Sequence, residues 1–121
     1  MIGISVGVLA VGLATATPAS AGTTADTTPP SVPLNLQGAP DRTADSTIRW
    51  DASTDNSGAI YHYWVIVDGQ QNARPVATSY DLGTLVDLCR ISAGTHTVTV
   101  QAVDRALNRS GQSNAIVVDV R

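Results

Sequence analysis

The stretch "WDASTDNSGAIYHYWVIVDG", Trp50 to Gly69, holds four of the chain's five aromatic residues, which are two Trp and three Tyr. Trp50 ends one short segment of alternating apolar residues, and "YHYWVIVDG" forms the next, with Asp and Asn side chains crowding the turn before it. Asp68-Gly69 is a strong hairpin signal because both residues tolerate the positive φ of a tight type I′ turn. The stretch therefore predicts a strand, a loop and a second strand of a small β protein.

The composition of the whole chain favours strands as well. All ten acidic residues are Asp and all seven basic residues are Arg, so Glu and Lys, the usual residues of exposed helical faces, are absent. With 121 residues the chain is expected to form one domain. The formal charge of −3 is small and evenly spread, and no run of Arg marks a phosphate-binding surface. No nucleic-acid partner is expected.

Short apolar segments, separated by turn residues roughly every eight to twelve positions, are typical of an antiparallel β-sandwich. Seven strands in two sheets are predicted, and no segment shows a convincing helical stripe. The predicted strands are Leu34–Gln37, Thr47–Asp51, Tyr61–Val67, Pro75–Ser79, Thr84–Leu88, His96–Val103 and Ala115–Val120.

Alternation along each predicted strand assigns residues to a face of the sheet. The third strand differs from the others because both of its faces are apolar, with Tyr63 and Val65 on one and Trp64 and Ile66 on the other. The other predicted core residues are Ile48, Trp50, Val86, Leu88, Val98, Val100, Ala102, Ile116, Val118 and Val120.

The N-terminal third of the chain reads as an export signal and a spacer. Residues 1–21 combine the apolar run "IGISVGVLAVGLATA" with a small-residue cleavage site ending at Ala21, so they are predicted to be a signal peptide. Residues 22–33, rich in Thr and Pro, are predicted to form an extended linker before a domain at 34–121. A secreted protein with no membrane span in its mature form is expected. Its lone Cys89 is interpreted as a half-buried apolar residue, with an intermolecular disulfide as the alternative.

These segments together resemble the fibronectin type III domain over about residues 26–120. The resemblance is carried by "TPPSVPLNL" at 28–36, "STIRW" at 46–50 and "YWVIVDG" at 63–69, and most strongly by "AGTHTVTVQAVDRALNRSGQSNAIVV" at 93–118. It implies an immunoglobulin-like β-sandwich of the bacterial secreted type. Such modules serve as non-catalytic spacers or accessory domains of enzymes that degrade polysaccharides such as chitin or cellulose.

Two features depart from that family's pattern. The family usually has a Tyr at the start of the sixth strand, whose hydroxyl bonds back to the preceding loop, and here His96 holds this place. A ring nitrogen can make a similar bond, which predicts a pH-sensitive corner. The segment "DLGTLVDLCRIS" at 81–92 is also spaced differently from the family's fifth strand.

Trp64 is the sharpest candidate for ligand binding. On the outer face of the third strand it is predicted to stand with Ile66 beside Thr99 and Gln101 of the sixth strand. An exposed indole can stack on a sugar ring or anchor a protein partner. The alternative is that Trp64 is covered or only pads a wide sheet.

A second candidate is a structural calcium site, the one cofactor considered for this chain. Three loops at one end of the predicted sandwich carry oxygen ligands, which calcium prefers in groups of six to eight. The alternative is that these residues form Asx turns. The candidate ligands are Asp26, Asp51, Asp55, Asn56, Asp104 and Asn108.

Catalysis is not expected from this chain. His62 and His96 are predicted to lie at opposite ends of the sandwich, so they share neither a zinc ion nor a triad. A domain of this size also has little chain with which to build a glycosidase cleft. The predicted function is an accessory or spacer module linked to extracellular polysaccharide degradation, with a cell-surface protein-interaction module as the alternative.

Overall fold

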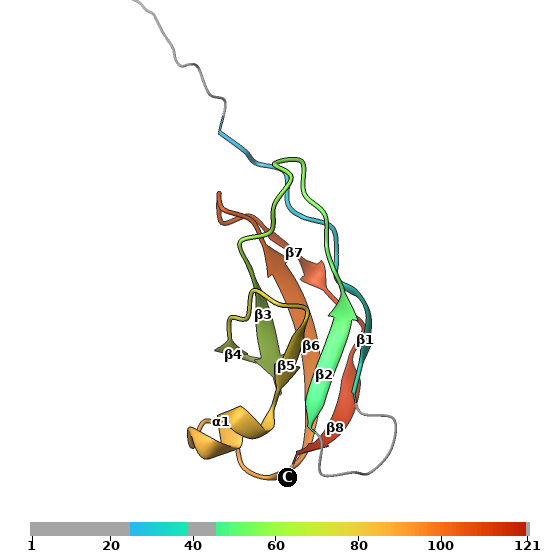
Figure 1. The fold of residues 1–121 in the computed structure, drawn as a ribbon, viewed down its shortest axis with the longest axis vertical. Coiled ribbons are helices and arrows are strands. Elements are labelled where there is room, and N and C mark those ends of the chain that lie inside the picture. The colour runs from blue at the N-terminus through green and yellow to red at the C-terminus, as the bar shows by residue number, and fades with distance from the viewer. Residues whose placement is uncertain (1–24, 39–45, 121) are drawn as a thin grey trace, which may run out of the picture.

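The computed structural model describes residues 25–38 and 46–120, which form two antiparallel β-sheets packed face to face (Figure 1). The all-β prediction is confirmed. The predicted signal peptide, residues 1–21, lies outside the described residues. Within the described ranges no helix has the length and apolar character needed to span a bilayer.

One sheet has three strands in the order β1-β2-β5, and the other has five, in the order β4-β3-β6-β7, with β8 also paired to β6. The short helix α1 lies at the end of the sandwich where β8 ends (Figure 1). The elements are β1 Leu34–Gln37, β2 Thr47–Asp51, β3 His62–Val67, β4 Gln70–Ala73, β5 Ser79–Asp81, α1 Gly83–Asp87, β6 Gly94–Val103, β7 Arg109–Gln112 and β8 Ile116–Val120.

The long strand β6 organises the larger sheet. On one side it pairs with β3 from His62↔Val103 to Val67↔Val98. On its other side β7 occupies the second half of β6 and β8 the first half. Between β7 and β8 the buried Ser113 hydroxyl accepts the amide of Val100, so a side-chain oxygen continues the hydrogen bonding where the edge strand is interrupted.

The core follows the predicted alternation. Trp50 is 5 % exposed and meets the Tyr63 ring edge to face, with the ring centroids 5.3 Å apart. The Tyr63 hydroxyl accepts the amide of Ser53 at 3.0 Å, so this ring also anchors the loop after β2. Both faces of β3 are buried apart from the half-exposed Trp64. The other fully or largely buried apolar residues include Leu36, Ile48, Val65, Val67, Leu82, Leu85, Val98, Val100, Ala102, Val118 and Val120.

The predicted strand Thr84–Leu88 is wrong, because these residues belong to helix α1, Gly83–Asp87. Leu82 and Leu85, three positions apart, are buried against the core, which a helical turn permits and an alternating strand does not. Leu88, predicted to point inward, is 59 % exposed. The β-branched residues of this segment favour a strand locally, but packing of the two leucines decides in favour of the helix.

The strand count also differs from the prediction, with eight strands in the described residues instead of seven. The Asp68-Gly69 hairpin is confirmed, with φ of 51° and 82° at the two residues. The strand that returns from this tight turn is β4, which begins at Gln70. The predicted strand Pro75–Ser79 is wrong, because only Ser79 of this range is in a strand. The strands β4 and β7 escaped prediction because their polar sequences show no apolar alternation.

The predicted linker lies along the sandwich from Asp26 onward. Pro30 and Pro33 are buried, and the amide of Ser31 donates to the carbonyl of Thr54 at 2.8 Å. The Asn108 side chain donates to the carbonyl of Asp26 at 2.9 Å. These contacts hold the chain before β1 against the loops after β2 and β6.

Candidate functional site

Trp64 lies on the outer face of β3, opposite Gln101 of β6, and Ile66 lies opposite Thr99. The expectation that Ile66 offers surface to a ligand is wrong, because it is 5 % exposed. Thr99 donates its hydroxyl hydrogen bond to Gln112, and Gln101 donates its amide to the carbonyl of Ser110. Trp64, Thr99 and Gln101 are all partly exposed, and Trp64 supplies the one aromatic ring among the four predicted contact residues.

The surroundings of Trp64 are aromatic and basic. The Arg74 guanidinium lies over its indole ring, 5.8 Å from the ring centroid. His62 also meets Trp64 edge to face, with centroids 5.4 Å apart, and is in similar contact with Tyr61 at 5.0 Å. The Arg105 guanidinium lies 5.2 Å from the centroid of Tyr61.

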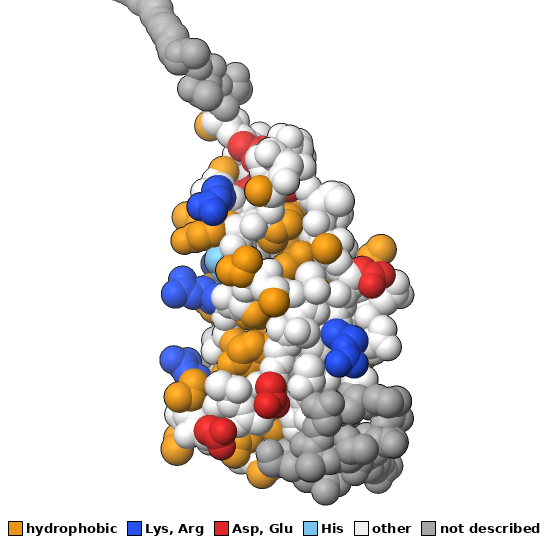
Figure 2. All heavy atoms as spheres, in the orientation of Figure 1, with side chains coloured by type: hydrophobic (Ala, Val, Ile, Leu, Met, Phe, Trp, Pro, Cys, Tyr) orange, Lys and Arg blue, Asp and Glu red, His pale blue; other side chains and the backbone are white. Residues whose placement is uncertain are grey.

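These five side chains form one continuous row, which we name the arginine–aromatic strip: Arg105, Tyr61, His62, Trp64 and Arg74. The strip follows the start of β3, and its two arginines come from the loop after β6 and the segment after β4. In Figure 2, basic side chains are spaced along the left margin of the molecule, the side on which β4 and α1 lie in Figure 1.

The strip leads into a groove of about 560 Å³ between the edge strands β4 and β5 and helix α1. Among the residues that the structure describes, two arginines and no carboxylate line this groove. Leu88, exposed at the end of α1, adds an apolar surface. Burial raises the pKa of Tyr80 above its ordinary value, while the nearby charge of Arg90 acts in the opposite direction. The groove lining includes Trp64, Asn72, Arg74, Tyr80, Leu88 and Arg90.

Sequence reasoning found Trp64 but missed its basic neighbours. Arg74, Arg90 and Arg105 lie in three separate segments and show no common spacing. The hairpin at Asp68-Gly69 brings Arg74 back beside Trp64, and α1 brings Arg90 to the groove. No local pattern could have identified this group.

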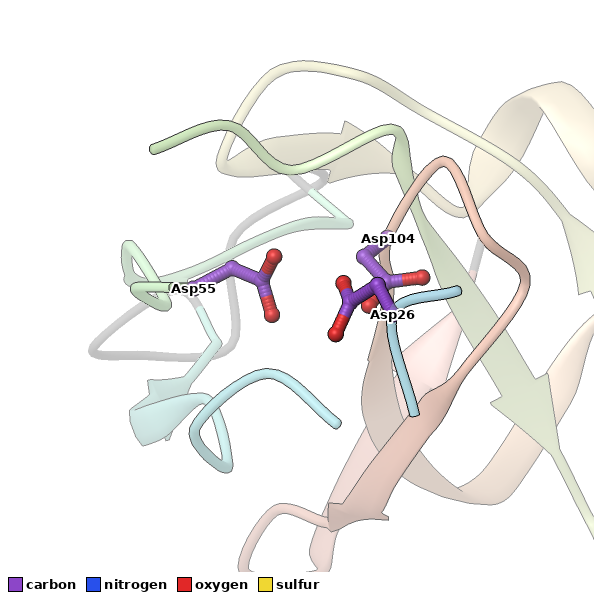
Figure 3. Close-up of side chains that lie close together, drawn as sticks. All are labelled: Asp26, Asp55 and Asp104. Atoms are coloured by element: carbon purple, nitrogen blue, oxygen red, sulfur yellow. The ribbon is translucent and has the colours of Figure 1, made fainter. Parts of the chain in front are cut away.

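The predicted calcium ligands converge in part. Asp26, Asp55 and Asp104 each place a carboxylate oxygen within 4.8 Å of the others, from the segment before β1 and the loops after β2 and β6. Figure 3 shows the three carboxylates pointing toward one another. We name these three residues the aspartate cluster.

The two asparagines reach the aspartate cluster through their amide nitrogens. Asn108 donates to Asp104 at 2.9 Å, and Asn56 donates to Asp26 at 3.3 Å. Asp51 does not reach the cluster, because it is on β2 and accepts the side-chain amide of Asn35 at 2.6 Å. The structure therefore brings together five of the six predicted ligand residues.

The electrostatics of the aspartate cluster are unusual for a surface loop. Asp104 is fully buried, and burial by itself raises its pKa. Hydrogen bonds from the Asn108 side chain and backbone, with further ones involving Asp26 and the Ala106 backbone, together outweigh burial and hold the pKa of Asp104 below its ordinary value. The Oδ1 atom of Asp55 is buried without a hydrogen-bond partner. The ionised form of Asp104 is thus favoured in a cluster where one carboxylate oxygen still lacks a donor.

The remaining titratable candidates are separated. His62 pairs with Val103 at the end of β6, whereas His96 lies near its start, which places the two histidines at opposite ends of the sheet as predicted. The interpretation of Cys89 as half-buried is wrong, because its side chain is exposed just after α1. In residues 25–38 and 46–120, Asp26, Asp55 and Asp104 are the residues grouped closely enough to hold a metal ion.

Comparison with known proteins places this sandwich beside bacterial chitinases. The chain is 39 % identical over 95 residues to chitinase A1 of Niallia circulans, covering 77 % of the chain and 12 % of that enzyme. It is 32 % identical over 99 residues to chitinase Chi52 of Paenibacillus xylanexedens, covering 78 % of the chain and 17 % of the enzyme. The chain thus corresponds to a small segment of each chitinase. No family model matches it.

Two solved structures share the fold. Chitinase ChiA74 from Bacillus thuringiensis has a TM-score of 0.60 at 22 % identity, over 81 % of this chain and 14 % of that one. The Clostridium perfringens spore cortex lytic enzyme SleM has a TM-score of 0.55 at 18 % identity, over 75 % of this chain and 28 % of that one. The chain is therefore a β-sandwich module homologous to a small region of bacterial chitinases.

Proposed function

We propose that this chain is an exported, non-catalytic module of the fibronectin type III type that binds polysaccharide and assists its extracellular degradation. The observation that carries the proposal is the 39 % identity to a segment making up 12 % of a chitinase. A segment of that share is too small to be the whole enzyme, which supports an accessory role. The partly exposed ring of Trp64, which lines a groove, supports the proposal because a sugar can rest on such a ring.

Retention on insoluble chitin tests this function. Wild-type protein is expected to sediment with chitin, and Trp64→Ala is expected to stay in the supernatant. Val117→Ala is the matched control, because Val117 is 69 % exposed on β8, away from the groove. Circular dichroism checks that both variants fold. Equal sedimentation of Trp64→Ala and wild type, or none by either, contradicts polysaccharide binding at Trp64.

The second function is a cell-surface protein-interaction module. The exposed Leu88 in the groove and the exposed thiol of Cys89 beside it favour this candidate, because a protein partner can cover both. Under this function the protein captures one discrete partner, and Leu88→Asp or alkylation of Cys89 weakens the capture while chitin sedimentation is absent.

We also propose that the aspartate cluster holds a structural calcium ion. The three carboxylates within 4.8 Å of one another and the unpartnered Oδ1 of Asp55 support this proposal. A divalent cation there offsets the repulsion between neighbouring carboxylates and gives the unpartnered oxygen an ion to coordinate. It also ties the segment before β1 to the loops after β2 and β6.

A further inference from the structure

We propose that the arginine–aromatic strip and its groove select polysaccharides that carry carboxylate groups, over neutral chains of the same sugar. This inference rests on the proposed polysaccharide-binding function and specifies the chemistry of the ligand. Its elements are the guanidinium groups of Arg74, Arg90 and Arg105 and the rings of Tyr61 and Trp64.

The position of Arg74 places a positive charge beside the Trp64 ring. Its guanidinium lies over the indole of Trp64, 5.8 Å from the ring centroid, so a ligand that rests on this ring also meets a cation. Stacking on an aromatic ring still leaves the edge N–H groups of a guanidinium free to donate hydrogen bonds. This part of the surface therefore presents the Arg74 guanidinium to a ligand. A guanidinium can bind a carboxylate through two parallel hydrogen bonds.

The three arginines form no ion pair with a carboxylate among the described residues. The ion pair that the structure shows in residues 25–38 and 46–120 joins His96 and Asp68, and no described carboxylate pairs with Arg74, Arg90 or Arg105. All three arginines are exposed. On a chain with a formal charge of −3, this edge gathers three exposed arginines, although the charge of Asp81 also acts on Tyr80 in the groove. Such a surface attracts anions and repels cations.

The strip and the groove together form an elongated surface. The rings of Tyr61 and Trp64 are connected through the ring of His62, whose centroid lies 5.0 Å from that of Tyr61 and 5.4 Å from that of Trp64. Arg105 lies on Tyr61 at one end, and the groove with Arg90 continues from Trp64 at the other. Cationic and aromatic groups that alternate along a line suit an extended polymer better than a compact anion. The polar side chains of Asn72 and Tyr80 in the groove can bond sugar hydroxyls.

The test compares two soluble derivatives of one polymer by calorimetric titration. Carboxymethyl chitin carries carboxylates, whereas glycol chitin has the same backbone without charge. At about 0.02 M salt we expect wild-type protein to bind carboxymethyl chitin at least tenfold more tightly than glycol chitin. At about 1 M salt, where the screening length is near 3 Å, this preference is expected to disappear.

Arginine variants locate the binding. Each exposed ion pair is worth up to about fivefold in affinity, so Arg74→Gln with Arg90→Gln is expected to lose about tenfold or more toward carboxymethyl chitin. Affinity for glycol chitin is expected to stay the same. The control is Arg49→Gln with Arg109→Gln, which removes the same charge from exposed positions on β2 and β7, outside the strip. This control is expected to bind as wild type does.

The possible results separate the inference from the proposed function. Equal affinity for both polymers, or equal losses in the two double variants, overturns the inference and leaves polysaccharide binding intact. Sedimentation with insoluble chitin together with no binding to carboxymethyl chitin also overturns the inference alone. If the protein binds neither of the two soluble polymers and does not sediment with insoluble chitin, both the inference and the proposed function are overturned.

Discussion

The imidazole of His96 lies between two acceptors, with Nδ1 2.6 Å from a carboxylate oxygen of Asp68 and Nε2 2.7 Å from the carbonyl of Ser92. Both contacts require an N–H, so the ring is held in its charged form. The other oxygen of Asp68 accepts the amide of Thr97 at 3.0 Å. The pair therefore joins the β3–β4 turn to the start of β6 and to the loop before it.

This pair predicts a pH-dependent stability. Hydrogen bonding to Asp68, and then to Ser92, raises the pKa of His96 above its usual 6.5. Hydrogen bonding to His96, and then to Thr97, lowers the pKa of Asp68 below its usual 3.8. The contribution of His96 is complete below pH 6.5 and is lost as pH rises through its raised pKa; that of Asp68 is complete above pH 3.8 and is lost as pH falls through its lowered pKa.

The thermal midpoint measured against pH checks this expectation. Wild type is expected to lose stability as pH rises above the range near 6.5. Asp68→Asn retains the turn, because Asn tolerates positive φ, and removes the charge that holds the proton on His96. The alkaline decrease is expected to shrink in this variant. An identical profile in Asp68→Asn and wild type contradicts the role given to the ion pair.

The hydrogen bond between Tyr63 and Ser53 predicts a stability loss on removal of one hydroxyl. Tyr63→Phe leaves the buried amide of Ser53 without its acceptor, which is expected to lower the free energy of unfolding by about 1 to 3 kcal/mol. Urea denaturation measures the change. Tyr61→Phe, at an exposed ring, is the control and is expected to change stability by less than about 0.5 kcal/mol. Equal effects of the two substitutions contradict this account.

The aspartate cluster predicts stabilisation by calcium. With a dissociation constant of about 1 mM, typical of weak extracellular sites, about 10 mM calcium adds roughly 1.4 kcal/mol to the free energy of unfolding. Thermal melting is expected to show a rise of several degrees in the midpoint. Asp55→Asn is expected to abolish the rise, whereas Asp51→Asn, outside the cluster, is expected to retain it. A midpoint unmoved by calcium in wild type rules the site out.

The tight hairpin predicts a requirement for glycine. Gly69 has a φ of 82°, at which a Cβ is disfavoured, so Gly69→Ala is expected to lose about 1 kcal/mol of stability. No atom lies within 4 Å of a Cβ built there, so the loss arises from the backbone and not from a clash. Gly69→Asn is expected to lose less, because Asn tolerates this conformation. Equal losses in both variants would argue against a backbone cause.

The sequence by itself determined the all-β architecture, because a two-residue apolar rhythm can bury one face only as a strand. Trp50, Val98, Val100 and Ala102 are buried as that rhythm predicted. The Asp68-Gly69 turn was readable for a similar reason, since few residue pairs tolerate two positive φ angles. In the candidate cluster, the loop positions of Asp26, Asp55 and Asp104 followed from the predicted topology.

Tertiary structure decided the remainder. Helix α1 forms because Leu85 within it and Leu82 just before it both reach the core in that conformation, against the strand preference of their neighbours. The polar strands β4 and β7 exist because β3 and β6 offer them unpaired backbone groups, which no property of their own side chains indicates. The arginine–aromatic strip likewise depends on contacts between residues far apart in the chain, and such contacts arise only when the two sheets have packed.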